Sequence, residues 1–272
     1  MVNRIFSFPI LPAAAALALC AALAAPVAGL AGGEPSHDTN LHAPLAAGDT
    51  LEVRNISGSI VVTQASGGNA TIDARVVAHS GDPASVAIRM VRDDHRLIVC
   101  AVYPGGDCTA DGRRGDGNGN DDRDDISVYF TIAIPRGVKL VAGIVDGDVV
   151  ARQLDAGVSA HAVSGNITVA TTGAADAHTV SGSIDATLGS IAKTDAMAFE
   201  SVSGPIHLTV PATADATIRA QTVNGSIEGD HGVALLVENG RWVGAKGTAT
   251  LGAGSAQISL RTVSGSIRVS RT

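Results

Sequence analysis

Aromatic side chains are scarce in this sequence: one Trp, two Tyr and four Phe make up 3% of its 272 residues. Carbohydrate clefts use such rings for stacking, so their scarcity argues against a sugar-stacking site. Charged residues are also few, at 17%, and the net charge is −7 without a cluster of Lys or Arg. Phosphate binding needs such clusters, so we expect no nucleic acid partner.

Cysteine is limited to three residues, and one of them lies in an N-terminal segment with the features of an export signal. Residues 1–31 carry a single charge, Arg4, before an Ala- and Leu-rich run that ends in small residues, as in a cleaved signal peptide. A retained membrane anchor is the alternative. Cleavage leaves 18 basic and 26 acidic residues, a charge of −8, and no further transmembrane helix. We therefore expect an exported protein of the periplasm or cell surface.

The other two cysteines, Cys100 and Cys108, are eight residues apart. Two cysteines in an exported chain predict a disulfide. Residues 32–50 are polar and interrupted by Pro and Gly, and they predict a linker. Short alternating runs from residue 51 to 135 predict an antiparallel β region with a hairpin at Asp93-Asp94-His95 and a last strand that stops at Pro135.

Glycine is abundant, with 32 residues, and from residue 136 to 272 it marks an internal repeat. Similar phrases, such as AVSGNI at 162–167 and TVSGSI at 179–184, recur at intervals of 18, 17, 22, 21 and 40 residues. The last interval is long enough to hide a degenerate unit or a hairpin at residues 238–254, and an outlying copy surrounds Gly58. The reference glycines of the repeat are Gly147, Gly165, Gly182, Gly204, Gly225 and Gly265.

Apolar residues flank each glycine at fixed positions: two before it, as at Val180, two after it, as at Ile184, and five and seven before it. Both sets follow the two-residue period of a strand, but the positions two before and two after the glycine are out of phase with the positions five and seven before it. We therefore predict a turn between the two sets, four and three residues before the glycine. Such a turn favours a parallel β-helix, or β-solenoid, with rungs of about 20 residues. In it Gly165, Gly182, Gly204 and Gly225 stack, and Val180 belongs to the core. Hairpins at the Ser-Gly and Asn-Gly pairs are the alternative.

The repeated phrases follow a signal peptide and the segment IPRGVKL at Ile134–Leu140. In this they resemble the bacterial putative-adhesin family of exported β-strand-repeat proteins, a domain of unknown function. The resemblance covers roughly residues 50–272. It implies a fold similar to parallel β-helices, and it supplies no catalytic residues.

Stacked rungs would align equivalent polar residues in columns. The column four residues before the glycine contains His161, His178 and Glu200, and two imidazoles with a carboxylate are ligands that zinc uses. The alternative is a solvated polar edge. A second column, three residues after the glycine, contains Thr168, Asp185, His207, Glu228 and Arg268.

Seven Asp residues lie between Asp107 and Asp125. The loop departs from an EF-hand because Asp121 stands where that loop has its glycine and Ser127 where it has its last glutamate. We therefore predict an acidic insertion, with calcium as the cofactor that its side chains could take. The residues with the alternating spacing of calcium ligands are Asp116, Asn118, Asn120, Asp122 and Asp124.

No Gly-x-Ser-x-Gly, His-Glu-x-x-His or phosphate-loop motif is present in the sequence. We predict a non-enzymatic exported β-repeat protein that acts at the cell envelope as an adhesin-like or scaffold surface. Its partner would be an envelope or extracellular polysaccharide or protein. The alternative is a β-helix polysaccharide lyase or hydrolase that uses carboxylates such as Asp185 and Glu228, because parallel β-helices host such enzymes.

Overall fold

The computed structural model describes residues 36–111, 125–240 and 244–272. The predicted signal peptide therefore lies outside the described residues. Residues Glu34–Thr272 form one compact unit, and its described residues form a sheet of 20 strands with one short 3-10 helix, η1 (Pro83–Ser85). Within the described ranges, no helix has both the length and the hydropathy needed to span a bilayer.

The strands fall into an N-terminal group and a repeat group. The first comprises β1 (Ser36–Pro44), β2 (Thr50–Arg54), β3 (Ser57–Gln64), β4 (Asn69–Ala78), β5 (Ala87–Asp93), β6 (Arg96–Val102), β7 (Ile126–Ile134) and β8 (Lys139–Leu154). The second comprises β9 (Val158–Ser164), β10 (Ile167–Thr171), β11 (Ala175–Ser181), β12 (Ile184–Leu188), β13 (Ala196–Ser203), β14 (Ile206–Val210), β15 (Ala216–Asn224), β16 (Ile227–Gly229), β17 (Leu236–Asn239), β18 (Ala245–Leu251), β19 (Ala256–Ser264) and β20 (Ile267–Arg271).

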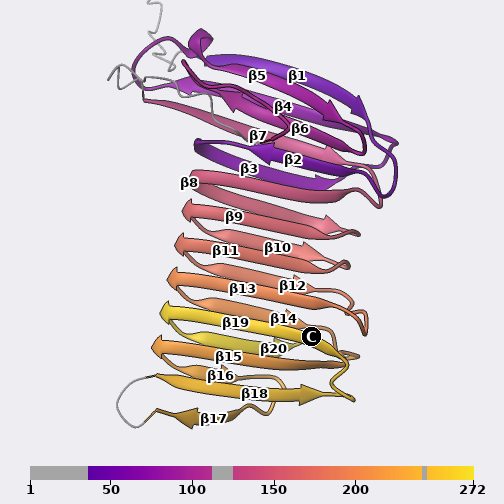
Figure 1. The fold of residues 1–272 in the computed structure, drawn as a ribbon, viewed down its shortest axis with the longest axis vertical. Helices are drawn as coiled ribbons and strands as arrows, with labels where there is room; N and C mark the ends of the chain where they lie inside the picture. The colour runs from indigo at the N-terminus through magenta and orange to yellow at the C-terminus, as the bar shows by residue number, and fades with distance from the viewer. Residues whose placement is uncertain (1–35, 112–124, 241–243) are drawn as a thin grey trace, which may run out of the picture. The chain divides into compact units, whose positions relative to one another are not determined.

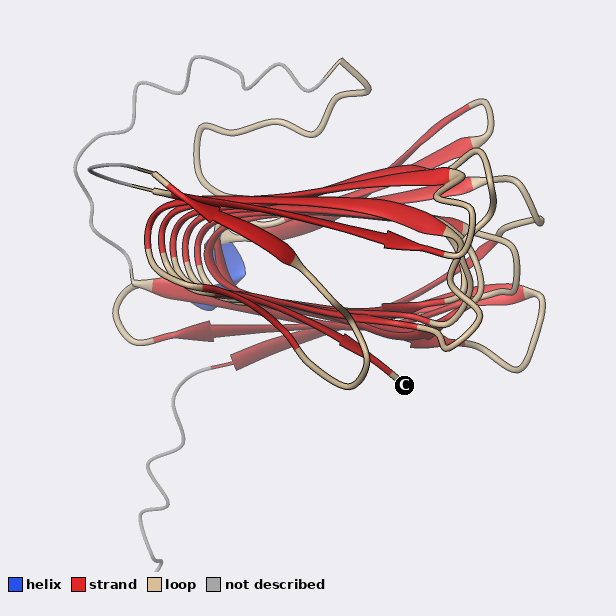
Figure 2. Cartoon of the chain, turned by 90° about the horizontal axis from the view of Figure 1, so that it is seen from below, coloured by secondary structure: helices blue, strands red, loops and turns tan. Residues whose placement is uncertain are grey.

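The repeat group is a β-solenoid, as the sequence predicts. Each rung is a long strand, a corner at the reference glycine and a short strand, and equivalent strands pair in parallel, β9 with β11 and β10 with β12. Figure 1 shows the rungs stacked one above another, and Figure 2 shows two layers of strands joined by superposed turns. The predicted alternative, in which each phrase folds back on itself, is excluded by these parallel pairings.

The order of the rungs in space differs from their order in the sequence. Strand β19 pairs in parallel with β13 on one side and with β15 on the other, so the C-terminal rung lies between two earlier rungs. Figure 1 shows this yellow rung among orange ones. Gly225 therefore stacks on Gly265 and not on Gly204, whereas Gly165, Gly182 and Gly204 stack directly as predicted. The long sequence interval holds an antiparallel hairpin, β17–β18, which was one of the two predicted possibilities.

The corner of each rung lies at the glycine and not at the predicted turn before it. The residues seven, five and three before Gly182, namely Ala175, Ala177 and Thr179, are all buried. The long strand thus keeps its two-residue period up to the corner, and the residues four and two before the glycine face outward. The prediction that Val180 is core is wrong, because its side chain is 47% exposed.

Glycine is required at the corner because the next rung approaches too closely for a side chain. A Cβ on Gly182 would lie 2.0 Å from the carbonyl oxygen of Gly165, and its φ is +154°. Residues with a side chain rarely adopt such a backbone conformation. The repeated glycine is therefore a consequence of stacking.

The N-terminal region is continuous with the solenoid. The predicted hairpin is confirmed, since β5 and β6 are antiparallel, but β2 and β3 both pair in parallel with β8, so the region is a mixed sheet. The rung that turns at Gly58 stacks directly on the rung of Gly147. The prediction of a linker over residues 32–50 is wrong for Ser36–Pro44, because β1 pairs with β4 along its whole length.

Candidate functional site

A groove runs along the stack beside the glycine corners. It consists of two adjoining cavities of about 550 and 580 Å³ that share His161 and Ala162 in their linings. The first cavity lies against β2, β6 and β8, and the second extends over the later long strands to β15. The outward-facing residues of the long strands form its two walls.

One wall is an apolar row that we call the valine ladder. It takes the residue two before each corner glycine, and most of its members are 41–47% exposed, with Val145 half-buried. In a repeat whose other apolar positions are buried, this row stands out as accessible. In spatial order the ladder is Ile56, Val145, Val163, Val180, Val202, Val263 and Val223.

In the second cavity, the floor of the groove is lined by the small residues three before the glycine, namely Ala162, Thr179, Ser201 and Thr262. The hydroxyl groups of this position are already used. The Thr179 hydroxyl donates to the Gly165 carbonyl at 3.0 Å, and Ser201 donates to Gly182 at 3.1 Å. Thr262 and Thr222 make the same bond to Gly204 and Gly265 at 3.0 Å. Because these donors are buried and satisfied, the floor offers a ligand little hydrogen bonding.

The opposite wall is a polar column with the spatial order Arg54, Gly143, His161, His178, Glu200, Arg261 and Gln221. The rings of His161 and His178 stack at a centroid distance of 5.3 Å. Glu200 lies 3.6 Å from His178 Nδ1 and 3.8 Å from Arg261 Nη1. The inserted C-terminal rung supplies Arg261, so its position in space gives Glu200 a cationic neighbour on each side when His178 is protonated.

His161 favours its neutral form. Burial lowers the pKa of His161, and the neighbouring His178 lowers it further, against a smaller opposite effect of Asp176. Its Nε2 atom lies 3.1 Å from the Ser159 hydroxyl. Near neutral pH the ring therefore adds a polar but uncharged surface to the groove.

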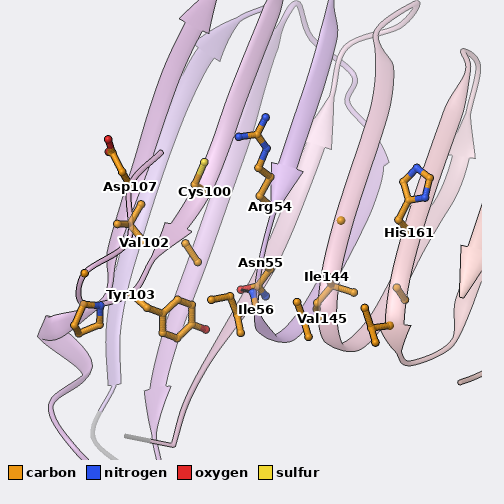
Figure 3. Close-up of a pocket in the computed structure, with 17 residues that line it drawn as sticks. Arg54, Asn55, Ile56, Cys100, Val102, Tyr103, Asp107, Ile144, Val145 and His161 are labelled. Atoms are coloured by element: carbon orange, nitrogen blue, oxygen red, sulfur yellow. Dashed lines mark hydrogen bonds between the residues drawn. The ribbon is translucent and has the colours of Figure 1, made fainter. Parts of the chain in front are cut away.

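The β2–β6 end of the groove is closed by the disulfide-linked segment. Cys100 and Cys108 are bonded, with Cα atoms 5.9 Å apart, which confirms the predicted disulfide. Arg54 Nη1 donates to the Thr109 carbonyl at 2.8 Å and holds the same segment. Figure 3 shows Ile56 and Val145 in one row and Arg54 and His161 in a second, with Tyr103 at the end of the cavity.

The predicted metal ligands are brought together only as a column. His161, His178 and Glu200 occupy successive rungs, but the two imidazoles stack face to face, and no group of three or more His, Cys, Asp or Glu in the described ranges is arranged to hold an ion. Parallel stacked rings do not direct their lone pairs at a shared point. The calcium candidates Asp116, Asn118, Asn120, Asp122 and Asp124 lie outside the described residues.

The second predicted column forms an ion-paired edge. Asp185 lies 3.0 Å from His207, and Arg268 lies 3.1 Å from Glu228. Asp185 and Glu228 are three rungs apart, or about 14 Å, beyond the roughly 5–9.5 Å that glycosidase carboxylates need. Hydrogen bonds from Arg268 and then Ser226 lower the pKa of Glu228, the opposite of what a general acid requires.

Sequence reasoning missed the groove because it placed the valines in the core. The missing signal is the small residue three before each glycine, such as Thr179, which has the same parity as the buried positions five and seven before it. With that residue counted, the valine and the polar residue two positions earlier share the outer face.

Comparison with known proteins relates the repeat to one family. Residues 164–270 match the model of the Toastrack DUF4097 family. No curated protein matches the chain. A "putative cell adhesion protein" from Clostridium sporogenes is similar in structure, with 10% identity, a TM-score of 0.45, and 87% of this chain and 100% of that chain covered. A "putative adhesin" from Bacteroides fragilis has 11% identity, a TM-score of 0.32, and coverages of 87% and 97%.

The family match bears on the same phrases that carry the resemblance in the sequence. Its range begins at Ser164, in the first of the two phrases quoted above, and ends within the last rung. The Toastrack domain is a β-solenoid, in agreement with the parallel rungs of the structure. Over residues 164–270, this chain is therefore similar to the Toastrack DUF4097 family.

Proposed function

We propose that this chain is a non-enzymatic, exported protein of the cell envelope that binds a partner along the groove between the valine ladder and the polar column. It acts as an adhesin-like or scaffold surface. The export signal expected at residues 1–31 and the disulfide of Cys100 and Cys108 support an oxidising compartment outside the cytoplasm.

The valine ladder is the observation that carries this proposal. A row of half-exposed Val and Ile side chains lowers the solubility of a protein and adds little to its core, so its repetition on every rung calls for another role. Binding faces of repeat proteins have this form, because each rung contributes one equivalent residue to an extended surface. The separation of Asp185 from Glu228 and the low pKa of Glu228 both count against a lyase or hydrolase.

The test combines fractionation with binding. Cells that express the chain are separated into cytoplasm, periplasm, membranes and medium, and purified protein is then incubated with isolated envelope, with and without calcium. We expect the protein outside the cytoplasm, and we expect binding to fall about tenfold or more in the double variant Val180→Asp with Val202→Asp. The matched control is Val237→Asp, which changes a valine of 39% exposure outside the groove.

Three outcomes bear on the proposal. Unchanged binding by the double variant, or equal loss in the Val237→Asp control, contradicts a role for the groove. Release of soluble sugar from the envelope, abolished by Asp185→Asn or Glu228→Gln, contradicts the non-enzymatic assignment. If binding requires calcium and is unchanged in the double valine variant, the binding site is the acidic loop and not the groove.

A further inference from the structure

We propose that the partner of the groove is a second copy of this chain, docked antiparallel so that the two valine ladders lie against each other. This inference rests on the proposed function, since it names the occupant of the same groove. The two copies would be related by a two-fold axis that passes through the rung of Val180, the middle member of the ladder.

The spacing of the ladder selects this occupant. Rungs paired as parallel strands repeat every 4.8 Å or so, which gives the ladder a length of about 29 Å over its six steps. An α-helix laid along the groove repeats every ~5.4 Å and drifts half a rung out of phase within about four rungs. Only another stack of β-rungs keeps the same period along the whole ladder, and this chain carries such a ladder itself.

The backbone of the groove excludes a different mode of peptide binding. The long strands on either side of each ladder position are already paired with neighbouring strands, as β11 is with β9 and β13. An added strand therefore finds no open edge inside the groove. Contact with the ladder must be made through side chains.

Charge on this face permits self-association. The whole chain has a net charge of −7, but the polar column, the ladder and the residues directly before the glycines contain two arginines, Arg54 and Arg261, and two acids, Asp146 and Glu200. With neutral histidines this strip has no net charge, so two copies do not repel each other there. Two further acids lie beside the strip at its β2–β6 end: Glu52, which pairs with Arg54 at 2.6 Å, and Asp107, which lines the first cavity.

The antiparallel direction follows from the polar column. A two-fold axis that crosses the strip at Val180 places the polar column of one copy opposite the polar column of the other. His161 then lies opposite Glu200 of the second copy, and Arg54 lies opposite its Gln221. No two like charges are opposed while His178 is neutral. The strip is about 29 Å long and about 10 Å wide, smaller than a standard interface of roughly 800 Å² per partner. We therefore expect a dimer that forms and dissociates with concentration.

Single cysteines test the arrangement directly. In the antiparallel dimer Val180→Cys meets itself and should form an inter-copy disulfide under mild oxidation. Val163→Cys should not, because its two copies stand about two rungs, or ~10 Å, apart, beyond the ~7 Å between Cα atoms that a disulfide can bridge. A mixture of Val163→Cys and Val202→Cys should cross-link. The unaltered protein, whose Cys100 and Cys108 are bonded to each other, is the control.

Sedimentation of the unaltered protein over a concentration series completes the test. We expect a monomer–dimer equilibrium that Val180→Asp weakens about tenfold or more and that Val237→Asp leaves unchanged. A monomer at every concentration, or cross-linking of Val163→Cys alone as fast as Val180→Cys, would overturn the antiparallel dimer.

The outcome separates this inference from the proposed function. If the chain stays monomeric while the double valine variant loses envelope binding, the self-docking is wrong and the groove still binds an envelope partner. If Val180→Cys forms the inter-copy disulfide while the double valine variant still binds envelope normally, the antiparallel dimer is supported. The proposed binding of envelope through the groove is then wrong.

Discussion

At the scale of the residue, the repeat is explained by two neighbouring positions with opposite environments. From the rung of Gly165 onward, the position three before the glycine points inward and carries Ala, Ser or Thr, and the Ser and Thr hydroxyls donate to the glycine carbonyl of the neighbouring corner. The position one residue later points outward and carries Val. The valine is repeated although it contributes little to the core, which is why we assign it to binding.

The corner glycine should not accept even a methyl group. In Gly182→Ala the added Cβ would overlap the Gly165 carbonyl and strain the backbone at φ +154°. We expect a loss of about 2–4 kcal/mol in the free energy of unfolding, measured by chemical denaturation. Ser181→Ala, at the exposed neighbouring position, is the control and should cost less than about 0.5 kcal/mol. A neutral Gly182→Ala would mean that the rungs are not stacked as described.

The ladder and the core should respond differently to substitution. Val180→Asp should change the free energy of unfolding by less than about 1 kcal/mol, because the side chain is 47% exposed and the carboxylate can remain hydrated. Phe199→Ala, at a fully buried position on the next rung, should cost about 3–5 kcal/mol. A large loss in Val180→Asp would restore the valine to the core and remove the basis of the groove.

At the scale of the element, the C-terminal rung holds the end of the solenoid together. Strands β19 and β20 occupy a place between β13–β14 and β15–β16, so the chain leaves a gap that only its last residues fill. Until they do, β15 has no parallel neighbour in the stack. The interactions Glu200–Arg261 and Glu228–Arg268 also depend on this insertion.

Truncation after Ser255 should therefore do more than remove one rung. We expect the shortened chain to lose the protection of β15 and β18 amides in hydrogen exchange and to aggregate, because edges of β13, β14, β15 and β16 become exposed. The control is the unaltered chain under the same conditions. Slow exchange of β15 in a soluble truncated chain would show that the end of the solenoid stands without its inserted rung.

The contact between the β5–β6 hairpin and the turn before β2 should depend on pH. The hydrogen bond with Asp49 raises the pKa of His95, and the Ala46 amide together with His95 lowers the pKa of Asp49. The stabilisation from protonated His95 is fully present below the usual His pKa of 6.5, and it is lost as the pH rises through the higher pKa of the folded state. The stabilisation from ionised Asp49 is fully present above the usual Asp pKa of 3.8, and it is lost as the pH falls through the lower pKa of the folded state.

The stabilisation from both groups is therefore largest between about pH 4 and pH 6.5. We expect His95→Gln to lower the melting temperature at pH 5.5 and to have a smaller effect at pH 8.5, measured by thermal unfolding. An equal effect at both pH values would show that the charge on His95 does not contribute.

At the scale of the whole molecule, the sequence predicts the solenoid but not its order or its surface. The period of the repeated phrases and the apolar alternation around Ile184 are local patterns, so a single sequence is enough to recognise them. The insertion of β19 between β13 and β15 is a long-range choice, since every phrase offers nearly the same edge to a neighbour. The pairing of β1 with β4 was equally hidden, because Ser36–Pro44 is polar and lies at an edge.

The polar column was correctly predicted as a column, because His161, His178 and Glu200 share one offset from the glycine. The exposure of Val180 depended on the location of the corner, and the sequence pattern allowed two locations. Thr179 is buried and its hydroxyl donates to the Gly165 carbonyl of another rung, so the corner lies at the glycine. The sequence indicates this location only when the small residue three before the glycine is counted with the buried positions five and seven before it.

The groove as a binding face is the central claim, and a cysteine footprint tests it most directly. Cysteines are placed singly at Val163, Val202 and Val263 on the ladder, and at Thr168 and His207 on the opposite edge as controls. Their alkylation rates are compared in dilute protein with and without isolated envelope. We predict that all five react readily in free protein, and that envelope slows the ladder positions about tenfold or more while the controls keep their rates. Ladder cysteines that react equally fast in both conditions, with slowing confined to Thr168 and His207, would contradict the account.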